Sequence, residues 1–117
     1  MIAHVVLFRP KAAMTDDEKR SFAQVFRQTL LDIPSVERAR VGRVGESHQA
    51  GGIDLGNTSD LFVVVLEFTD QYGLSNYLNH PNHEELARLF WVHNESTAIL
   101  DVPMRDPKNE DIGQFLV

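Results

Sequence analysis

Leu61-Phe62-Val63-Val64-Val65-Leu66-Glu67-Phe68 is the strongest strand signal in the chain, because it is apolar at nearly every position. Side chains of a strand alternate between the two faces of a sheet, so this run predicts a strand that is buried on both faces. Ala3 to Phe8 has the same character and is closed by Pro10. Both strands are therefore predicted to lie at the centre of a sheet.

A helix is predicted between these two strands, from about Asp16 to Leu31. It begins at a capping box, Thr15-Asp16-Asp17-Glu18, in which Thr15 can cap the helix and Glu18 can reach back. An apolar stripe at helical spacing follows, namely Phe22, Val25, Phe26 and Leu30.

Three further elements complete the predicted order. Val36 to Gly45 is predicted as an edge strand, with Ala39 and Val41 on one face and Arg38 and Arg40 on the other. A second helical region begins near Gln71, is interrupted at His80-Pro81, and restarts with Asn82 as its cap. Ser96 to Val102 forms the last strand, and Glu46 to Asp60 is a long connection.

The element order β-α-β-β-α-β is that of the ferredoxin-like α+β fold, with a four-stranded antiparallel sheet. Two helices can cover only one face of such a sheet, which leaves roughly 400 Å² of apolar surface on the other. A second copy of the chain is the simplest cover, since most homo-oligomers have twofold symmetry. The alternative is that the tail, Phe115-Leu116-Val117, folds back over its own sheet.

Composition limits the classes of function. The chain has 117 residues, of which 43% are hydrophobic and 24% charged, as expected for one soluble domain. Seventeen acidic and eleven basic side chains give a net charge of −6, so neither nucleic acid nor an anionic membrane is an expected partner. Without cysteine, disulfides and thiolate chemistry are excluded. No signal peptide or membrane-spanning run is recognised at the start, so a cytoplasmic location is expected.

Tyr77-Leu78-Asn79-His80-Pro81-Asn82-His83 is the segment most suggestive of chemistry, with two histidines and a phenol within seven residues. In the functional interpretation, one imidazole acts as a general base and Tyr77 donates a hydrogen bond to a carbonyl. In the structural interpretation, His80 braces the turn before Pro81 and His83 lies in the first helical turn. A metal site is disfavoured because no further ligand is placed to complete it, so no metal or cofactor is expected.

The sequence resembles the stress-responsive A/B barrel domain family (Dabb), the dimeric α+β barrels, from Ile2 to Val102. The matching segments are His4-Val5-Val6-Leu7-Phe8, Ile33-Pro34-Ser35-Val36, Val41-Gly42, Leu66-Glu67-Phe68 and the Tyr77 to His83 segment. The resemblance implies a homodimer whose two sheets face each other in a barrel. Residues 1–102 are thus predicted to form the domain, and residues 103–117 a C-terminal extension that docks on the partner subunit or frays.

The resemblance implies several functions, because the family includes cofactor-free polyketide cyclases and stress-induced proteins without an established reaction. By likeness to the cyclases, the catalytic candidates are His83, Tyr77 and His4. His83 would take a proton α to a carbonyl in an aldol reaction, and Tyr77 would hold the enolate oxygen. The alternative is a non-enzymatic, stress-related dimer with structural histidines. Oxidation of an aromatic substrate or haem, as in related monooxygenase-type barrels, has no support beyond the fold.

A small carbonyl-containing molecule, bound in a pocket between helix and sheet, is the predicted ligand. The residues predicted to bind it are His80, Val6, Phe8 and Phe26. His4 alternates with Val6 and Phe8, so these three side chains should share one face of the first strand, which we expect to be the barrel interior.

Overall fold

The computed structural model describes residues 1–46 and 56–117. The elements are β1 (Ile2–Pro10), α1 (Asp16–Asp32), β2 (Arg38–Arg43), β3 (Phe62–Phe68), α2 (Gln71–Leu78), α3 (Pro81–His93), β4 (Asn94–Pro103) and α4 (Ile112–Leu116). The strands form one antiparallel sheet in the order β2-β3-β1-β4. The predicted ferredoxin-like α+β fold is confirmed, with β1 and β3 at its centre. Most of the predicted connection from Glu46 to Asp60 lies outside the described residues.

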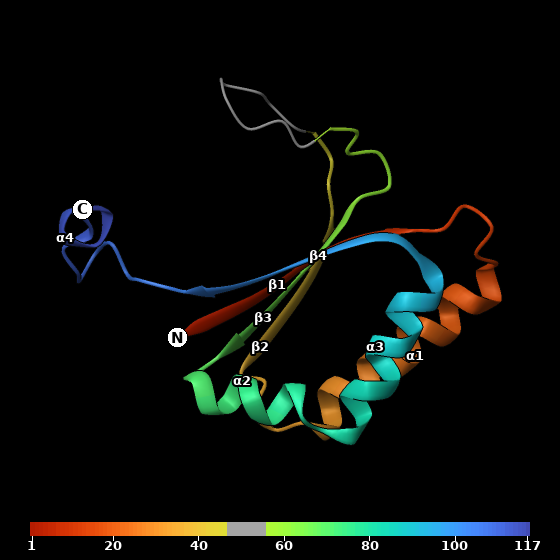
Figure 1. Cartoon of the computed structure of the whole chain (residues 1–117), viewed down its shortest axis with the longest axis horizontal. Helices are drawn as coiled ribbons and strands as arrows, with labels where there is room; N and C mark the ends of the chain where they lie inside the picture. The colour runs from red at the N-terminus through yellow and green to blue at the C-terminus, as the bar shows by residue number, and fades with distance from the viewer. Residues whose placement is uncertain (47–55) are drawn as a thin grey trace.

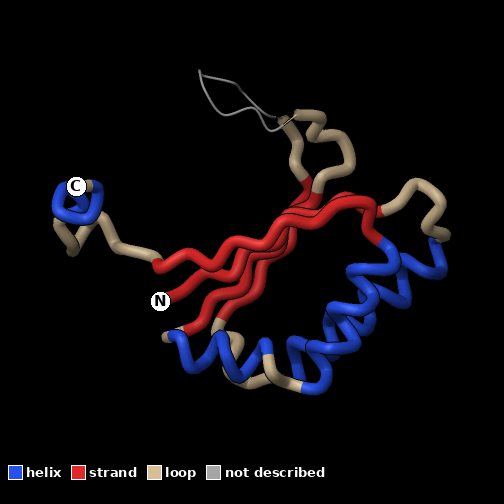
Figure 2. Tube along the Cα trace, in the orientation of Figure 1, coloured by secondary structure: helices blue, strands red, loops and turns tan. Residues whose placement is uncertain are grey.

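Helices α1, α2 and α3 all lie on one side of the sheet (Figures 1 and 2). The core between the two layers is built on β3 and α2, whose Phe68, Leu66 and Leu74 are 0%, 1% and 1% exposed. Burying each such side chain contributes about 1.5–3 kcal/mol to folding. No helix among the described residues is long and apolar enough to cross a membrane.

The register of the sheet determines which side chains face the helices. Opposite His4 lie Leu66 on β3 and Asp101 on β4. His4, Val6 and Phe8 are all buried beneath the helices, so the prediction that they share a face is correct. The prediction that this face is the barrel interior is wrong, because the chain's own helix layer covers it (Figure 1).

The opposite face of the sheet has no helix over it in the part of the chain that is described (Figure 2). By the alternation of side chains, it carries Val5 and Leu7 of β1, Val63 and Val65 of β3, and Leu100 and Val102 of β4. We call these six residues the open face. Leu100 remains 52% exposed and Val102 36% exposed. The central strands therefore have the two apolar faces that the sequence predicts.

The C-terminal extension does not cover the open face. It leaves β4 and runs away from the helix layer, ending in α4 at the far end of the molecule (Figure 1). Phe115 is 54% exposed and Leu116 77% exposed. The alternative that the tail folds back over its own sheet is therefore wrong.

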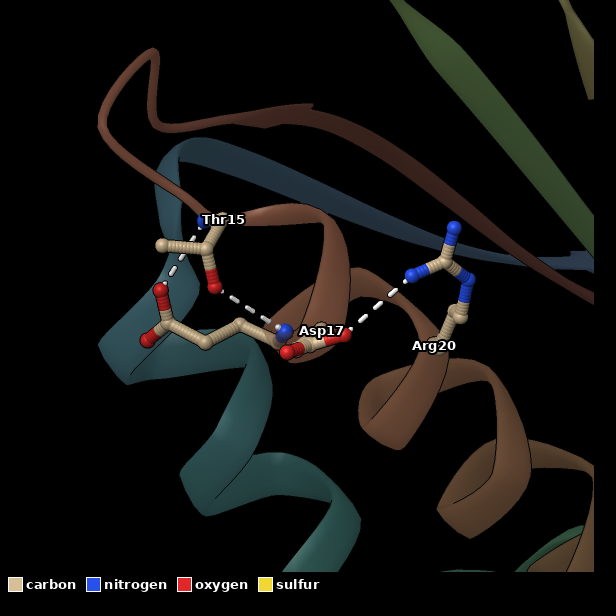
Figure 3. A network of polar contacts seen from close by, with 4 residues as sticks. Thr15, Asp17 and Arg20 are labelled. Carbon is tan, nitrogen blue, oxygen red and sulfur yellow. Dashed lines mark hydrogen bonds and ion pairs between the residues drawn. The ribbon is translucent and has the colours of Figure 1, made fainter.

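The N-terminus of α1 confirms the predicted capping box (Figure 3). The Glu18 backbone N–H donates to Thr15 Oγ1 at 3.1 Å, and the Thr15 N–H donates to Glu18 Oε1 at 2.9 Å. Arg20 also donates to Asp17 at 3.2 Å, within the first turns of the helix. The two contacts between Thr15 and Glu18 satisfy backbone N–H groups that have no partner inside the helix.

The cap of α3 differs from the prediction. His80, and not Asn82, is the N-cap, and its Nδ1 accepts the Asn82 backbone N–H at 3.1 Å. The reason is Pro81, which occupies the first helical position, where its missing N–H is no loss and its fixed φ suits the helix. The Asn82 side chain instead donates to Asp32 Oδ2 at 2.9 Å, which ties α3 to the end of α1.

Candidate functional site

Two features lie between the sheet and its helices. A polar cluster of His4, Tyr77, His83 and Asp101 surrounds the start of β1, and an aromatic cavity lies around the end of the same strand. The backbone from His4 to Phe8 spans about 13 Å at the usual rise of a strand. The cluster and the cavity are thus neighbours on one face and remain distinct.

His4 is the buried centre of the polar cluster. Its ring is 4% exposed, and its Nδ1 lies 2.5 Å from Oδ1 of Asp101. A carboxylate accepts a hydrogen bond from the imidazole N–H, which orients the ring and fixes the proton on Nδ1. Asp101 was not among the predicted residues, although it is the one carboxylate between Ala98 and Val102. Pairing the first and last strands in register would have identified it.

Tyr77 lies between the two imidazoles. Its ring centre is 5.8 Å from that of His4 and 4.8 Å from that of His83, with edge-on geometry in both contacts. Burial raises the pKa of Tyr77 to about 12, so its hydroxyl stays protonated near neutral pH. No residue that the structure describes accepts or donates a hydrogen bond at this hydroxyl. It is therefore available as a donor.

His83 stands in the first turn of α3 and is partly buried. Burial lowers its pKa below the ordinary value of 6.5, and the nearby His4 lowers it further. A hydrogen bond with the Leu78 backbone and the charge of Glu84 act in the opposite direction. The imidazole is consequently neutral near pH 7, as a general base must be.

The three predicted catalytic residues thus come together, and His80 remains outside their cluster. Its Nδ1 is engaged by the cap of α3, so this nitrogen is not free to meet a ligand. Among the described residues, no group of three or more His, Cys, Asp or Glu side chains could hold a metal ion.

The aromatic cavity has a volume of about 710 Å³. Its walls carry five phenylalanines, from β1, α1, β3 and α3: Phe8, Phe22, Phe26, Phe62 and Phe90. Two of the predicted ligand-binding residues, Phe8 and Phe26, line it, whereas Val6 and His80 do not. Neither His83 nor Tyr77 is part of the lining. Phe62 and Phe90 were missed because they are brought here by β3 and α3 only in the folded chain.

The phenylalanines hold one another in place. The Phe8 ring stacks on Phe62 with 5.5 Å between centres and meets Phe90 edge-on at 5.1 Å. Phe22 also meets Phe90 edge-on, at 4.9 Å. Such contacts favour fixed ring orientations. The cavity therefore has flat, largely preformed walls, which suit a planar apolar ligand.

Polar side chains complete the lining. Arg43 forms an ion pair with Asp60, and its guanidinium lies 5.5 Å from the centre of the Phe62 ring. His93 Nδ1 lies 3.7 Å from a Glu18 carboxylate oxygen. Lys11 and Lys19, both exposed, also line the cavity.

The class of protein follows from a family comparison. The model of the stress responsive A/B barrel domain, Dabb, matches residues 2–104. The chain therefore belongs to this family, as its sequence motifs predict. No curated protein matches it in sequence.

Solved structures place the chain in the same fold. A Dabb family protein from Mesorhizobium loti is 27% identical, with a TM-score of 0.65 over 89% of this chain and 97% of that one. A dimeric ferredoxin-like protein of unknown function from Thermobifida fusca is 20% identical, with a TM-score of 0.67 over 88% and 90%. Hydroxynitrile lyase from Passiflora edulis is 15% identical, with a TM-score of 0.70 over 90% and 94%. Dimeric proteins thus occur among these neighbours.

The lowered pKa of His83 predicts a dependence of stability on pH. The unfolded chain binds a proton at His83 below about pH 6.5, whereas the folded chain resists it, so stability is complete above that pH and falls as the pH decreases. Urea unfolding measured between pH 5 and 7 should show a shallower decline for His83→Gln than for the wild type. An unchanged slope, or an NMR titration of His83 above pH 6.5, would contradict the assignment.

Proposed function

We propose that the protein binds a small carbonyl-containing molecule in the aromatic cavity between its helices and its sheet. The single observation that carries the proposal is the cavity itself, since its volume of about 710 Å³ lies within the range of small-molecule sites. Five mutually packed phenylalanines provide flat walls, and polar groups are confined to a few positions. A planar ligand would bury most of its surface there without a large rearrangement of the protein.

A fluorescent aromatic ketone tests this binding directly. We expect 6-propionyl-2-dimethylaminonaphthalene to bind the wild type with a blue-shifted emission, because the cavity removes its ring from water. Ala23→Trp, which fills the cavity from α1, should weaken binding at least tenfold. Gln24→Trp, at the next helical position and outside the lining, is the matched control and should bind as the wild type does.

Equal binding by Ala23→Trp and Gln24→Trp, with both variants folded by circular dichroism, would show that the probe binds elsewhere. Absence of binding to the wild type would refute the proposal.

A second candidate function, cofactor-free acid–base chemistry on the ligand carbonyl, is supported by the polar cluster. A neutral His83 would remove a proton α to the carbonyl, and the Tyr77 hydroxyl would donate a hydrogen bond to the resulting enolate oxygen. Asp101 would orient His4 beside them. Because the cluster lies outside the cavity lining, a substrate would have to extend along β1 to reach it.

Deuterium exchange tests this second candidate without a known substrate. In D2O, His83 would take a methyl proton of 2-acetylnaphthalene, and the enolate would then receive a deuteron from the exchanged imidazolium. We expect the wild type to accelerate methyl deuteration, and His83→Gln to abolish the acceleration. Tyr77→Phe should slow the deuteration at least tenfold. His80→Asn, which keeps an acceptor at the α3 cap, is the control and should leave the rate unchanged. Exchange at the buffer rate would contradict acid–base catalysis.

The open face is proposed to be the interface of a homodimer. Covering roughly 400 Å² of it is worth on the order of 10 kcal/mol before association entropy is subtracted, and the neighbours described as dimeric support this arrangement. We also propose that the C-terminal extension, residues 103–117, packs on the partner subunit. The extension is internally ordered, with Arg105 placed 5.5 Å from the Phe115 ring, yet its apolar side chains contact little of their own chain.

Sedimentation velocity at micromolar concentration tests the interface. We expect a dimer for the wild type and a monomer for Val65→Asp, because a carboxylate would be buried in the centre of the interface. Leu31→Asp, at an exposed position of α1 on the other side of the sheet, should remain dimeric. A chain ending at Met104 should dissociate at a higher concentration than the full chain. A monomeric wild type would refute the proposal, and an unaffected Val65→Asp dimer would exclude this face.

A further inference from the structure

The charges around the aromatic cavity are opposite in sign to those of the whole protein. Lys11, Lys19 and Arg43 line the cavity, and Asp60 is the only acidic residue among its lining residues. The chain as a whole carries a net charge of −6. The cavity thus concentrates positive charge on an acidic protein.

Two of these positive charges have no acidic partner. Asp60 is paired with Arg43, so this couple is close to neutral. Neither Lys11 nor Lys19 forms an ion pair with any residue that the structure describes. Glu18, the residue before Lys19, lies beside His93 and is not part of the lining.

The two lysines are held at the cavity by the fold. The Lys11 backbone N–H donates to the His93 carbonyl at 2.8 Å, which fastens the end of β1 to the end of α3. Lys19 lies in α1 immediately after the capping box, and its backbone N–H donates to the Thr15 carbonyl at 2.9 Å. The two lysines thus reach the cavity from different segments, Lys11 from the turn after β1 and Lys19 from α1.

We propose that the ligand of this cavity is an aromatic or similarly planar molecule with a carboxylate or another anionic group. Its ring would lie among the phenylalanines, and its anionic group would meet Lys11 and Lys19. Charge-assisted hydrogen bonds are stronger than neutral ones, particularly where the ring next to the anion is out of water. This inference rests on the proposed ligand-binding function and adds the charge of the ligand to it.

A matched pair of probes separates the charge of the ligand from its shape. We expect 2-naphthoate to bind the wild type at least tenfold more tightly than 2-naphthylmethanol, measured by naphthyl fluorescence at low salt. The preference should decrease at high salt, because ions screen exposed charges. The double variant Lys11→Met, Lys19→Met should bind the two probes with similar affinity. Lys108→Met removes the remaining lysine of the chain, outside the cavity, and should keep the preference.

The possible results distinguish this inference from the function on which it rests. Similar affinities of the wild type for both probes would refute the anionic ligand and leave cavity binding intact. A preference that persists in the double variant would exclude the two lysines. Failure of both probes to bind would refute the binding function and the inference together.

Discussion

Apolar side chains on both faces of the two central strands are the constraint on which the rest of the structure depends. The face of β1 with Val6 and Phe8 is covered by the chain's own helices, and there the core and the aromatic cavity form. The other face, with Val5 and Leu7, has no cover within the described part of the chain. A single layer of helices covers only one face of a four-stranded sheet, so the apolar side chains of the other face stay exposed in a monomer. The site and the proposed dimer thus arise from opposite faces of the same strands.

The sequence predicted the fold well because its signals are local and consistent. Alternation and edge polarity placed β1 and β3 at the centre, and the capping box located the start of α1 to the residue. The cap of α3 was missed because Pro81 suits the first helical position, which moves the cap back to His80. The face of β1 with His4, Val6 and Phe8 was wrongly assigned to the barrel interior for another reason. Alternation groups residues by face, but only the path of the helices decides which face they cover.

The candidate site was predicted in part. The spacing from Tyr77 to His83 and the early His4 identified three residues whose rings meet in the fold. Asp101 was missed because its contact with His4 depends on the register between the first and last strands. A pocket between helix and sheet was predicted with Phe8 and Phe26, but the rest of its lining was missed for the same kind of reason, since its walls come from four elements. Local motifs therefore found the histidines and the tyrosine of the polar cluster, whereas the full lining of the cavity required the tertiary arrangement.

The helix-covered face contains two different environments a few residues apart. At His4 a buried imidazole is paired with Asp101, and at Phe8 the walls are apolar with charges on the rim. Both lie on the face that the helices cover, and we propose that a second copy of the chain covers the other face. An isotope-filtered NOE experiment on a mixture of labelled and unlabelled chains tests this claim most directly. The account predicts intermolecular NOEs among the methyl groups of Val63, Val65 and Leu7. Intermolecular NOEs restricted to the helices, or none at all, would contradict it.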